Sequence, residues 1–252
     1  MKQLKLEFIK NKLSFLILIT ALFLAFNFIW SSYGLRTASA SEKHWGFMMI
    51  LYQMPILNAI LSPCYVAVIA SRIADVEHKG ETLKLLYTLQ SRASLYHAKL
   101  GLGALLSLLL SIGQALIVIC IGLMFHFENA IPFDKIALYF LLSFFVTFAS
   151  YILQLNLSLL IRNQMVSLSI GVIGSFCGLF MMFLNQFPLL QYIVLWTNYV
   201  TLTLSELSKY DSKTRYIEYA WRSLNPWGLL SVALWILVLY VTGRHLFNKK
   251  EV

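Results

Sequence analysis

The sequence has few charged residues for its length. Of its 252 residues, only 12% are Asp, Glu, Lys or Arg, whereas hydrophobic residues make up 59%. A soluble globular protein carries about 25% charged residues, because its surface faces water. The mean hydropathy of +0.73 points the same way. These values exclude a soluble enzyme, a disordered chain and a disulfide-stabilised scaffold, and they indicate a polytopic membrane protein.

Several chemical motifs are also missing. The sequence has no G-x-x-x-x-G-K-S/T loop, so we do not expect the chain to bind ATP through a phosphate-binding loop. Its apolar stretches contain no carboxylate, which argues against a proton- or ion-coupled transporter. The three cysteines have no metal-binding spacing, and there is no H-E-x-x-H motif. The sequence therefore predicts that this chain is not an enzyme and has no catalytic residue, metal or cofactor of its own.

Six apolar stretches are candidates for membrane-spanning helices. They contain no Asp, Glu, Lys or Arg, and they cover residues 13–33, 47–70, 100–125, 136–161, 165–187 and 228–243. A bilayer core about 30 Å thick needs roughly 20 residues of helix, and backbone groups in lipid must be paired within the helix. We therefore expect an all-α polytopic membrane protein, with residues 1–252 forming one permease domain of six transmembrane helices.

The positions of Lys and Arg predict the orientation. If the N-terminus is cytoplasmic, 13 of these residues lie in inner segments and 7 in outer segments, which is the expected bias. Both termini and the segment 72–99 are then cytoplasmic, and the segment 188–227 is on the outside. The same bias accounts for the net charge of +9 without a nucleic-acid partner. Residues 1–12 are basic with interleaved apolar residues, which fits either a helix on the inner lipid surface or a frayed basic flank.

The segment 72–99 is the most informative part of the chain. Acidic and basic residues are concentrated between Asp75 and Lys84, and Gly80 allows a bend where the preceding helix ends. Beyond Gly80, apolar residues recur at helical spacing, which predicts a helix along the membrane surface. Ser91 is a candidate cap for the helix that becomes the third span. A mixed-charge patch of this kind indicates either a docking face for a soluble partner or a solvated loop.

This segment resembles the permease subunits of type-2 ABC exporters. The residues that carry the resemblance are Glu77, Gly80, Lys84, Leu86, Leu89, Ser91, Arg92, Tyr96 and Lys99. The chain length, the six spans and the basic N-terminal segment fit as well. Within the family, the chain is most similar to the permeases of lantibiotic self-immunity transporters, which have an Asn-Pro-Trp before the last span, here residues 225–227. It departs from many members at Gln90, where they have proline.

The resemblance implies a coupling helix, which in the family sits in a cleft of the ATP-binding subunit and transmits its opening and closing to the spans. The contact residues that it implies here are Asp75, Glu77, Lys79, Gly80, Glu81 and Lys84. It also implies partly inserted outer helices between the fifth and sixth spans. The implied partners are membrane lipid, a second copy of this permease or a related one, and ATP-binding cassette subunits that bind ATP and Mg.

The resemblance further implies a function in a bacterial plasma membrane. The chain would belong to an exporter that expels an amphiphilic peptide, a lantibiotic or a related antimicrobial peptide, and so gives immunity or resistance. Another hydrophobic peptide, a drug or a lipid fits the chemistry equally well. An alternative of a different class is a non-transporting membrane anchor or sensor for a cytoplasmic partner.

A few polar and small residues inside the predicted spans are candidates for helix packing or for a transport pathway. Uncharged amides in lipid usually form hydrogen bonds between helices, and glycines at regular spacing allow two helices to approach closely, within one chain or across a dimer. The candidates are Asn58, Gln114, Gln154, Asn156, Gly171, Gly174 and Gly178.

Overall fold

The computed structural model describes residues 7–37, 44–79, 91–161, 163–181, 188–211 and 216–249. Six of its helices are long and apolar enough to cross a membrane. They are α2 (Leu13–Thr37), α4 (Gly46–Lys79), α6 (Arg92–Met124), α7 (Phe133–Leu160), α8 (Gln164–Met181) and α11 (Pro226–Lys249). Each overlaps one of the six predicted stretches, so the prediction of an all-α polytopic membrane protein is confirmed.

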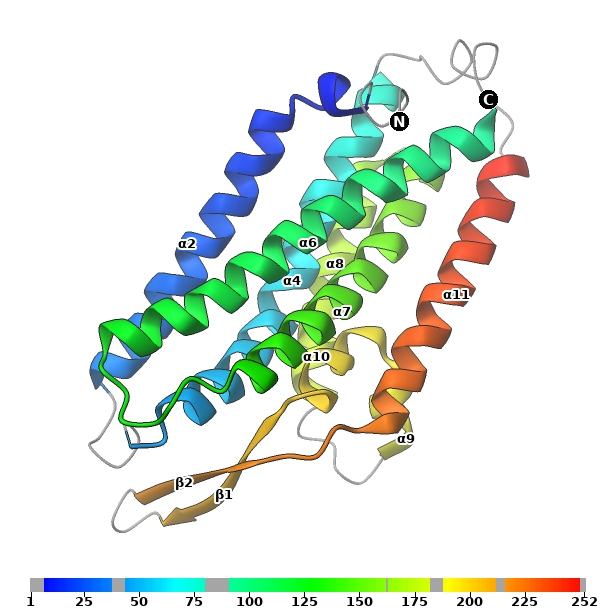
Figure 1. The fold of residues 1–252 in the computed structure, drawn as a ribbon. Coiled ribbons are helices and arrows are strands. Elements are labelled where there is room, and N and C mark those ends of the chain that lie inside the picture. Colours follow the sequence, from blue (N-terminus) through cyan, green and yellow to red (C-terminus); the bar gives the residue numbers. More distant parts are fainter. Residues whose placement is uncertain are drawn as a thin grey trace.

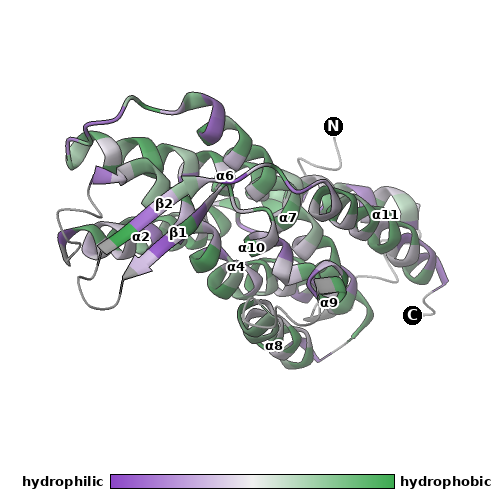
Figure 2. Cartoon of the chain, turned by 90° about the horizontal axis from the view of Figure 1, so that it is seen from below, coloured by the Kyte–Doolittle hydropathy of each residue, from purple (hydrophilic) through white to green (hydrophobic). Residues whose placement is uncertain are grey.

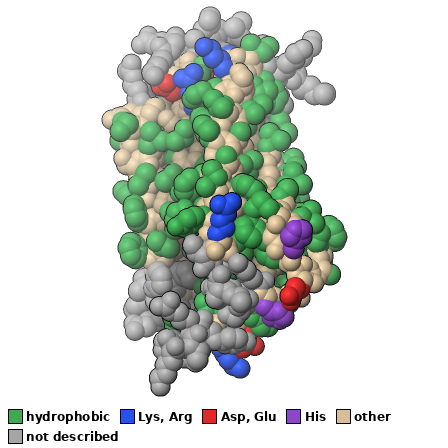
Figure 3. All heavy atoms as spheres, turned by 90° about the vertical axis from the view of Figure 1, so that its left-hand side faces the viewer, with side chains coloured by type: hydrophobic (Ala, Val, Ile, Leu, Met, Phe, Trp, Pro, Cys, Tyr) green, Lys and Arg blue, Asp and Glu red, His purple; other side chains and the backbone are tan. Residues whose placement is uncertain are grey.

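The six helices form one elongated bundle, and α6 crosses it obliquely (Figure 1). Both termini lie at the same end of the bundle as the end of α4 and the start of α6. Figure 3 shows one face of the molecule, on which a broad band of hydrophobic side chains lies between charged side chains near the top and charged and histidine side chains in the lower half. This distribution fits a bundle whose middle faces lipid and whose ends face water.

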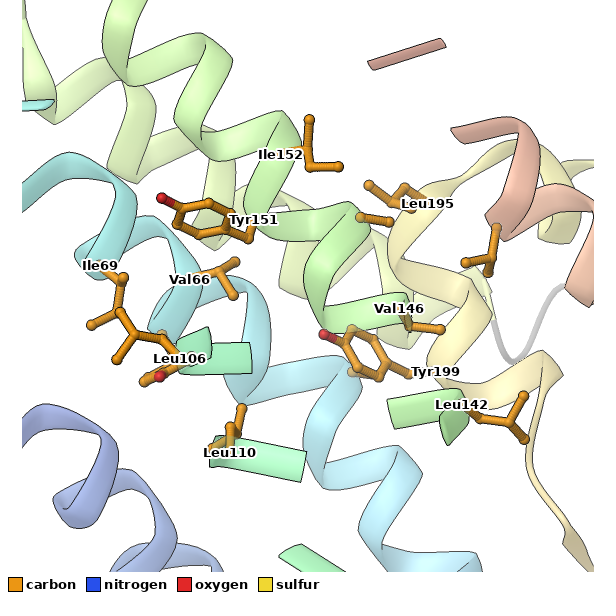
Figure 4. Packing of buried hydrophobic residues seen from close by; sticks show 14 of the residues in the cluster. Val66, Ile69, Leu106, Leu110, Leu142, Val146, Tyr151, Ile152, Leu195 and Tyr199 are labelled. Carbon is orange, nitrogen blue, oxygen red and sulfur yellow. The ribbon is translucent and has the colours of Figure 1, made fainter. Parts of the chain in front are cut away.

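Helix α4 is the central helix of the bundle. It packs against α2, α6, α7 and α8, and 72% of its most apolar window is buried, compared with 17% for α2. Figure 4 shows how side chains from α4, α6, α7 and the segment between α8 and α11, called the outer segment after its predicted side, meet in the core. The labelled residues are Val66, Ile69, Leu106, Leu110, Leu142, Val146, Tyr151, Ile152, Leu195 and Tyr199. Because α4 touches most other helices, its position fixes theirs.

Helices α4 and α6 extend well beyond the predicted spans 47–70 and 100–125. Helix α4 continues to Lys79, and α6 already begins at Arg92. The predicted cap at Ser91 is confirmed, because its side chain accepts a hydrogen bond from the Ser94 backbone N–H at 3.4 Å. The two helices therefore lead toward residues 80–90 from both sides.

The segment between α8 and α11 contains the expected short helices, which are α9 (Pro188–Ile193), the 3-10 helix η1 (Leu195–Thr197) and α10 (Asn198–Thr201). It also contains an antiparallel pair of strands that we did not predict, β1 (Ser205–Asp211) and β2 (Tyr216–Trp221). The two strands lie at the end of the bundle opposite the termini (Figure 1) and carry many hydrophilic residues (Figure 2). The aromatic residues of β2 suit a strand.

Candidate functional site

The predicted contact residues lie at the end of α4 and in the connection that follows it. Asp75 is half-buried, and Glu77 is only 1% exposed. Lys79 is the last residue of α4. Gly80, Glu81 and Lys84 lie outside the described residues. Among the predicted charges that the structure does describe, Glu77 therefore points into the protein instead of toward a partner.

Glu77 belongs to a buried charge cluster, formed by Glu7, Lys10, Glu77 and Lys99. The Lys99 side chain is completely buried, and its Nζ lies 2.9 Å from Glu77 Oε1. The same Nζ donates hydrogen bonds to Glu7 Oε2 and to the Ile73 carbonyl oxygen, each at 3.2 Å. Lys10 Nζ lies 3.9 Å from carboxylate oxygens of both glutamates. Two lysines thus face two glutamates, with Lys99 inside the bundle and Lys10, whose side chain is 30% exposed, at the edge of the cluster.

The charge cluster joins three parts of the chain that are distant in sequence. Glu7 and Lys10 belong to the N-terminal segment before α2, Glu77 lies near the end of α4, and Lys99 lies near the start of α6. The Asn11 amide donates hydrogen bonds to the Glu7 carboxylate and to its carbonyl oxygen, both at 3.0 Å, and so holds Glu7 in place. Removing one partner from a buried ion pair costs about 3–5 kcal/mol, because the other charge is left uncompensated, so each of the three parts depends on the others for its charge balance.

The first turns of α6 also contact α7 and α11. The Tyr96 hydroxyl donates to Asn156 Oδ1 at 2.8 Å, and Asn156 Nδ2 donates to the Leu239 carbonyl oxygen at 2.8 Å. His97 Nε2 lies 2.9 Å from the Tyr240 hydroxyl, and the two rings stack. Asn156, one of the predicted polar candidates, therefore connects α6, α7 and α11 in one chain of hydrogen bonds.

A glycine allows α6 and α7 to approach closely just inside the bundle. A Cβ at Gly103 would lie 1.8 Å from the Tyr151 ring, so only glycine fits there. The Tyr151 hydroxyl then donates to the Lys99 carbonyl oxygen at 2.9 Å. The start of α6 is thus in direct contact with the N-terminal segment, α4, α7 and α11.

A second polar group lies deeper in the bundle, between α4, α6 and α7. Asn58 and Gln114 exchange two hydrogen bonds, at 2.7 and 3.1 Å. The Ser143 hydroxyl donates to Gln114 at 2.7 Å, and Asn58 Nδ2 also donates to the Tyr139 hydroxyl at 3.1 Å. Asn58 and Gln114, both predicted candidates, are buried and bonded to each other, and their bonds to Ser143 and Tyr139 hold three helices at a fixed register.

The remaining polar candidate, Gln154, lies between α7 and α8. The Ser167 hydroxyl is 3.1 Å from the Gln154 side-chain amide and 2.7 Å from the Ser158 hydroxyl. On the same side of α8, a Cβ at Gly171 would lie 2.7 Å from Ala67 Cβ of α4. Gly171 therefore allows α8 to lie directly against α4.

Gly174 and Gly178 face an aromatic side chain from the outer segment. A Cβ at Gly174 would lie 2.3 Å from the Trp196 ring, and one at Gly178 would lie 3.0 Å from Trp196 Cβ. Trp196 belongs to η1, so the predicted row of glycines packs against the outer segment of its own chain.

The outer segment enters the bundle through Tyr199 of α10. Its hydroxyl donates to Thr147 of α7 at 3.1 Å. Burial raises the pKa of the Tyr199 phenol to about 12, although this hydrogen bond lowers it, so the phenol stays protonated and neutral. An apolar groove of about 630 Å³ lies between α9 and α11 and is lined by residues that include Leu189, Tyr192, Trp227 and Leu234. Such a surface can hold an apolar chain.

Sequence reasoning missed Glu7 as a site residue and did not pair Lys99 with any partner. Two signals were available for these residues. Glu7 is the one acidic residue among four lysines in positions 1–12, and Lys99 is the last charge before a long apolar stretch. A charge at such a border needs a partner when the helix is packed on all sides. Within the described ranges, no group of three or more His, Cys, Asp or Glu side chains could hold a metal ion.

The sequence was also compared with known proteins. The model of the family described as ABC-2 family transporter protein matches residues 3–178, which is more than half of the chain. The matched range runs from the N-terminal segment through most of α8 and includes all four residues of the charge cluster. No curated protein matches the chain.

Proposed function

Because the chain belongs to the ABC-2 transporter family, we propose that it is the membrane permease of an ATP-driven exporter in a bacterial plasma membrane. A separate ATP-binding cassette subunit would bind ATP and Mg and hydrolyse the ATP. Two permeases, identical or related, would pair across the membrane and use two such subunits. The movement of the ATP-binding subunits would shift the helices of both permeases between two packed states.

The observation that carries this proposal is the position of the start of α6. It follows residues 80–90 directly, and it contacts the N-terminal segment, α4, α7 and α11. A displacement of residues 80–90 would therefore reach most of the bundle through one helix end. This is the arrangement that a permease needs if a soluble subunit drives its helices.

Within the proposal, the predicted contact residues have two different tasks. Lys79, Gly80, Glu81 and Lys84, together with the half-buried Asp75, would form the surface that the ATP-binding subunit holds. Glu77 would act indirectly, because its buried carboxylate is paired with Lys99 and holds the end of α4 in place. Both termini would lie on the same cytoplasmic side as this surface.

The proposed cargo is an amphiphilic peptide, a lantibiotic or a related antimicrobial peptide, whose expulsion would protect the cell. The apolar groove between α9 and α11 supports an apolar cargo. The long helices carry carboxylates only near their ends, Asp75 and Glu77 in α4 and Asp134 in α7, so recognition would rest on shape and apolar contact. Another hydrophobic peptide, a drug or a lipid would be held in the same way, and a resistance assay separates these classes.

The first test asks whether an ATP-binding subunit holds residues 80–90. The tagged chain is purified from native membranes in mild detergent, as wild type and as Lys84→Glu, and the bound proteins are identified. Glu77 is unsuitable for this test, since reversal of its buried charge would disturb folding. The matched control is Arg244→Glu, a charge reversal at an exposed position at the same end of the bundle. We expect wild type and Arg244→Glu to retain an ATP-binding cassette protein and Lys84→Glu to lose it.

Absence of such a protein, even after cross-linking, would contradict an ATP-driven exporter and favour the anchor or sensor alternative. If the partner binds, the cargo is tested next in cells that express the complex. We expect a higher inhibitory concentration for a lantibiotic such as nisin than in cells with an ATPase-deficient partner. No change for nisin together with a higher inhibitory concentration for lipophilic dyes would assign the exporter to another hydrophobic cargo.

A further inference from the structure

The charge cluster is more elaborate than the fold requires. A buried ion pair is weak evidence for stability, since apolar residues of similar volume often stabilise a protein as well or better. Here one completely buried lysine, Lys99, holds carboxylates from two separate parts of the chain, at 2.9 Å for Glu77 and at 3.2 Å for Glu7. Such an arrangement can hold several segments of the chain in one defined relative position.

The two carboxylates occupy different positions relative to residues 80–90. Glu77 precedes this connection and Lys99 follows it. Their ion pair therefore joins the end of α4 to the start of α6, which we call the base of the connection. Glu7 instead belongs to the N-terminal segment that leads into α2. Helix α2 is the least buried of the six long helices, with 17% of its most apolar window buried, and it packs mainly against α6 and α4.

We propose that Lys99 is a positioning residue that makes the N-terminal segment, and with it the start of α2, follow the base of the 80–90 connection. The inference rests on the proposed function, in which an ATP-binding subunit displaces this connection. Displacement of Lys99 would then pull Glu7 directly, because the two side chains are joined by a charged hydrogen bond in a buried environment.

The first experiment tests the attachment and needs no ATP-binding subunit. A spin label is placed at Ile9, which is 68% exposed, in the full chain in lipid nanodiscs, after Cys64→Ser, Cys120→Ala and Cys177→Ala. The variant is Glu7→Gln, which removes the negative charge at position 7 and leaves Lys99 and Lys10 paired with Glu77. Its matched control is Lys12→Gln, because Lys12 lies in the same segment but is exposed.

We expect an immobile label in wild type and in Lys12→Gln. In Glu7→Gln, the ratio of attached to released segment should fall by about ten- to a hundredfold, because the segment loses its charged hydrogen bond to Lys99 and keeps only the longer ion pair of Lys10 with Glu77, at 3.9 Å. Lys99→Met should give the same release, but it leaves two carboxylates with only Lys10 as a partner and can prevent folding, so Glu7→Gln is the deciding variant. An equally immobile label in Glu7→Gln would overturn the proposal.

The second experiment tests whether the segment follows the connection, which a purely structural role would not require. The same label is measured in the complex with its ATP-binding subunit, with and without vanadate-trapped nucleotide. We expect trapping to change the label spectrum in wild type and in Lys12→Gln but not in Glu7→Gln, although all three bind the subunit. Unchanged spectra in wild type with the subunit bound would overturn the proposal and leave the exporter function intact. Failure of the subunit to bind would overturn the exporter function, and with it this role of Lys99.

Discussion

At the scale of single residues, burial distinguishes charged residues that the fold depends on from charged residues that lie only on its surface. Lys99 is completely buried between two glutamates, whereas the Lys209 side chain is 76% exposed beside Glu218 on the hairpin. Exposed ion pairs contribute about 0–1 kcal/mol, because water screens both charges. A buried pair that loses one partner leaves an uncompensated charge, which costs far more.

This contrast predicts the stability of two lysine variants. Lys99→Met should lower the free energy of unfolding by about 3–5 kcal/mol, since two buried carboxylates lose their closest partner and keep only Lys10, at 3.9 Å. Lys209→Met should change it by less than about 1 kcal/mol. The measurement is unfolding in mixed detergent micelles, followed by helical circular dichroism. Adding Glu7→Gln and Glu77→Gln to Lys99→Met should recover part of the loss, and equal losses for the two single variants would contradict the argument.

The space around glycine gives a second prediction for single residues. A Cβ at Gly243 would lie 2.1 Å from Asn156 Oδ1, so Gly243→Ala should force the amide away from Tyr96 and from the Leu239 carbonyl oxygen. The loss of these buried hydrogen bonds should cost about 1–3 kcal/mol. At Gly34 the nearest atom would be 3.6 Å away, so Gly34→Ala is the matched control. The thermal inactivation temperatures of both variants in detergent test this, and a drop at Gly34 of the same size would refute it.

At the scale of helices, polar contacts in the bundle fix the register of α4, α6 and α7. Asn58, Gln114, Tyr139 and Ser143 are bonded to one another, and each lies on one of these three helices. Apolar packing alone tolerates a helix that slides or rotates slightly, because lipid and side chains are equally apolar. A bonded amide pair allows one relative position.

A double-mutant cycle tests the pair between α4 and α6. Asn58→Leu and Gln114→Leu should each destabilise the chain by about 1–3 kcal/mol, because each leaves a buried amide without its partner. The double variant should be more stable than the sum predicts, by about 0.6–1.7 kcal/mol, the range found for hydrogen bonds between transmembrane helices. Additive effects of the two substitutions would show that the amides do not interact. The exposed pair of positions Leu109 and Leu116 on α6, changed to alanine, serves as the control for additivity.

The sequence was sufficient to predict elements but not their contacts. The apolar stretches predicted all six long helices, and Ser91 predicted the start of α6, because both are local properties of the chain. Asn58 and Gln114 were selected as buried polar residues, yet their pairing depends on how two helices are rotated about their axes. The hairpin was missed because its two strands are short. Their aromatic residues also suit the membrane surface, so they did not indicate a strand by themselves.

At the scale of the whole molecule, the two ends of the bundle differ in construction. The end with both termini contains the charge cluster and the start of α6, and the opposite end contains the hairpin and the short helices α9 and α10 (Figure 1). The distribution of Lys and Arg favours the first end for the cytoplasm. The two ends should therefore be accessible from opposite sides of the membrane.

Cysteine labelling tests this orientation in intact cells. In the chain without its three native cysteines, Ser208→Cys on β1 should react with a membrane-impermeant maleimide from outside. Lys249→Cys, at the exposed end of α11, should react only after the cells are permeabilised. Both positions are exposed, so burial does not bias the comparison. Labelling of Lys249→Cys in intact cells would reverse the orientation.

The oblique course of α6 has a mechanical consequence. Its 33 residues make it longer than a bilayer core requires, and it runs from α11 at one end of the bundle to α2 at the other (Figure 1). A helix of this length extends about 25 Å to either side of its middle, so a tilt of about 5° would move each tip by about 2 Å. The two tips would move in opposite directions. A small inward movement of one tip at one membrane surface would therefore move the other tip outward at the opposite surface. Helix α6 would thus act as a lever between the two faces of the membrane.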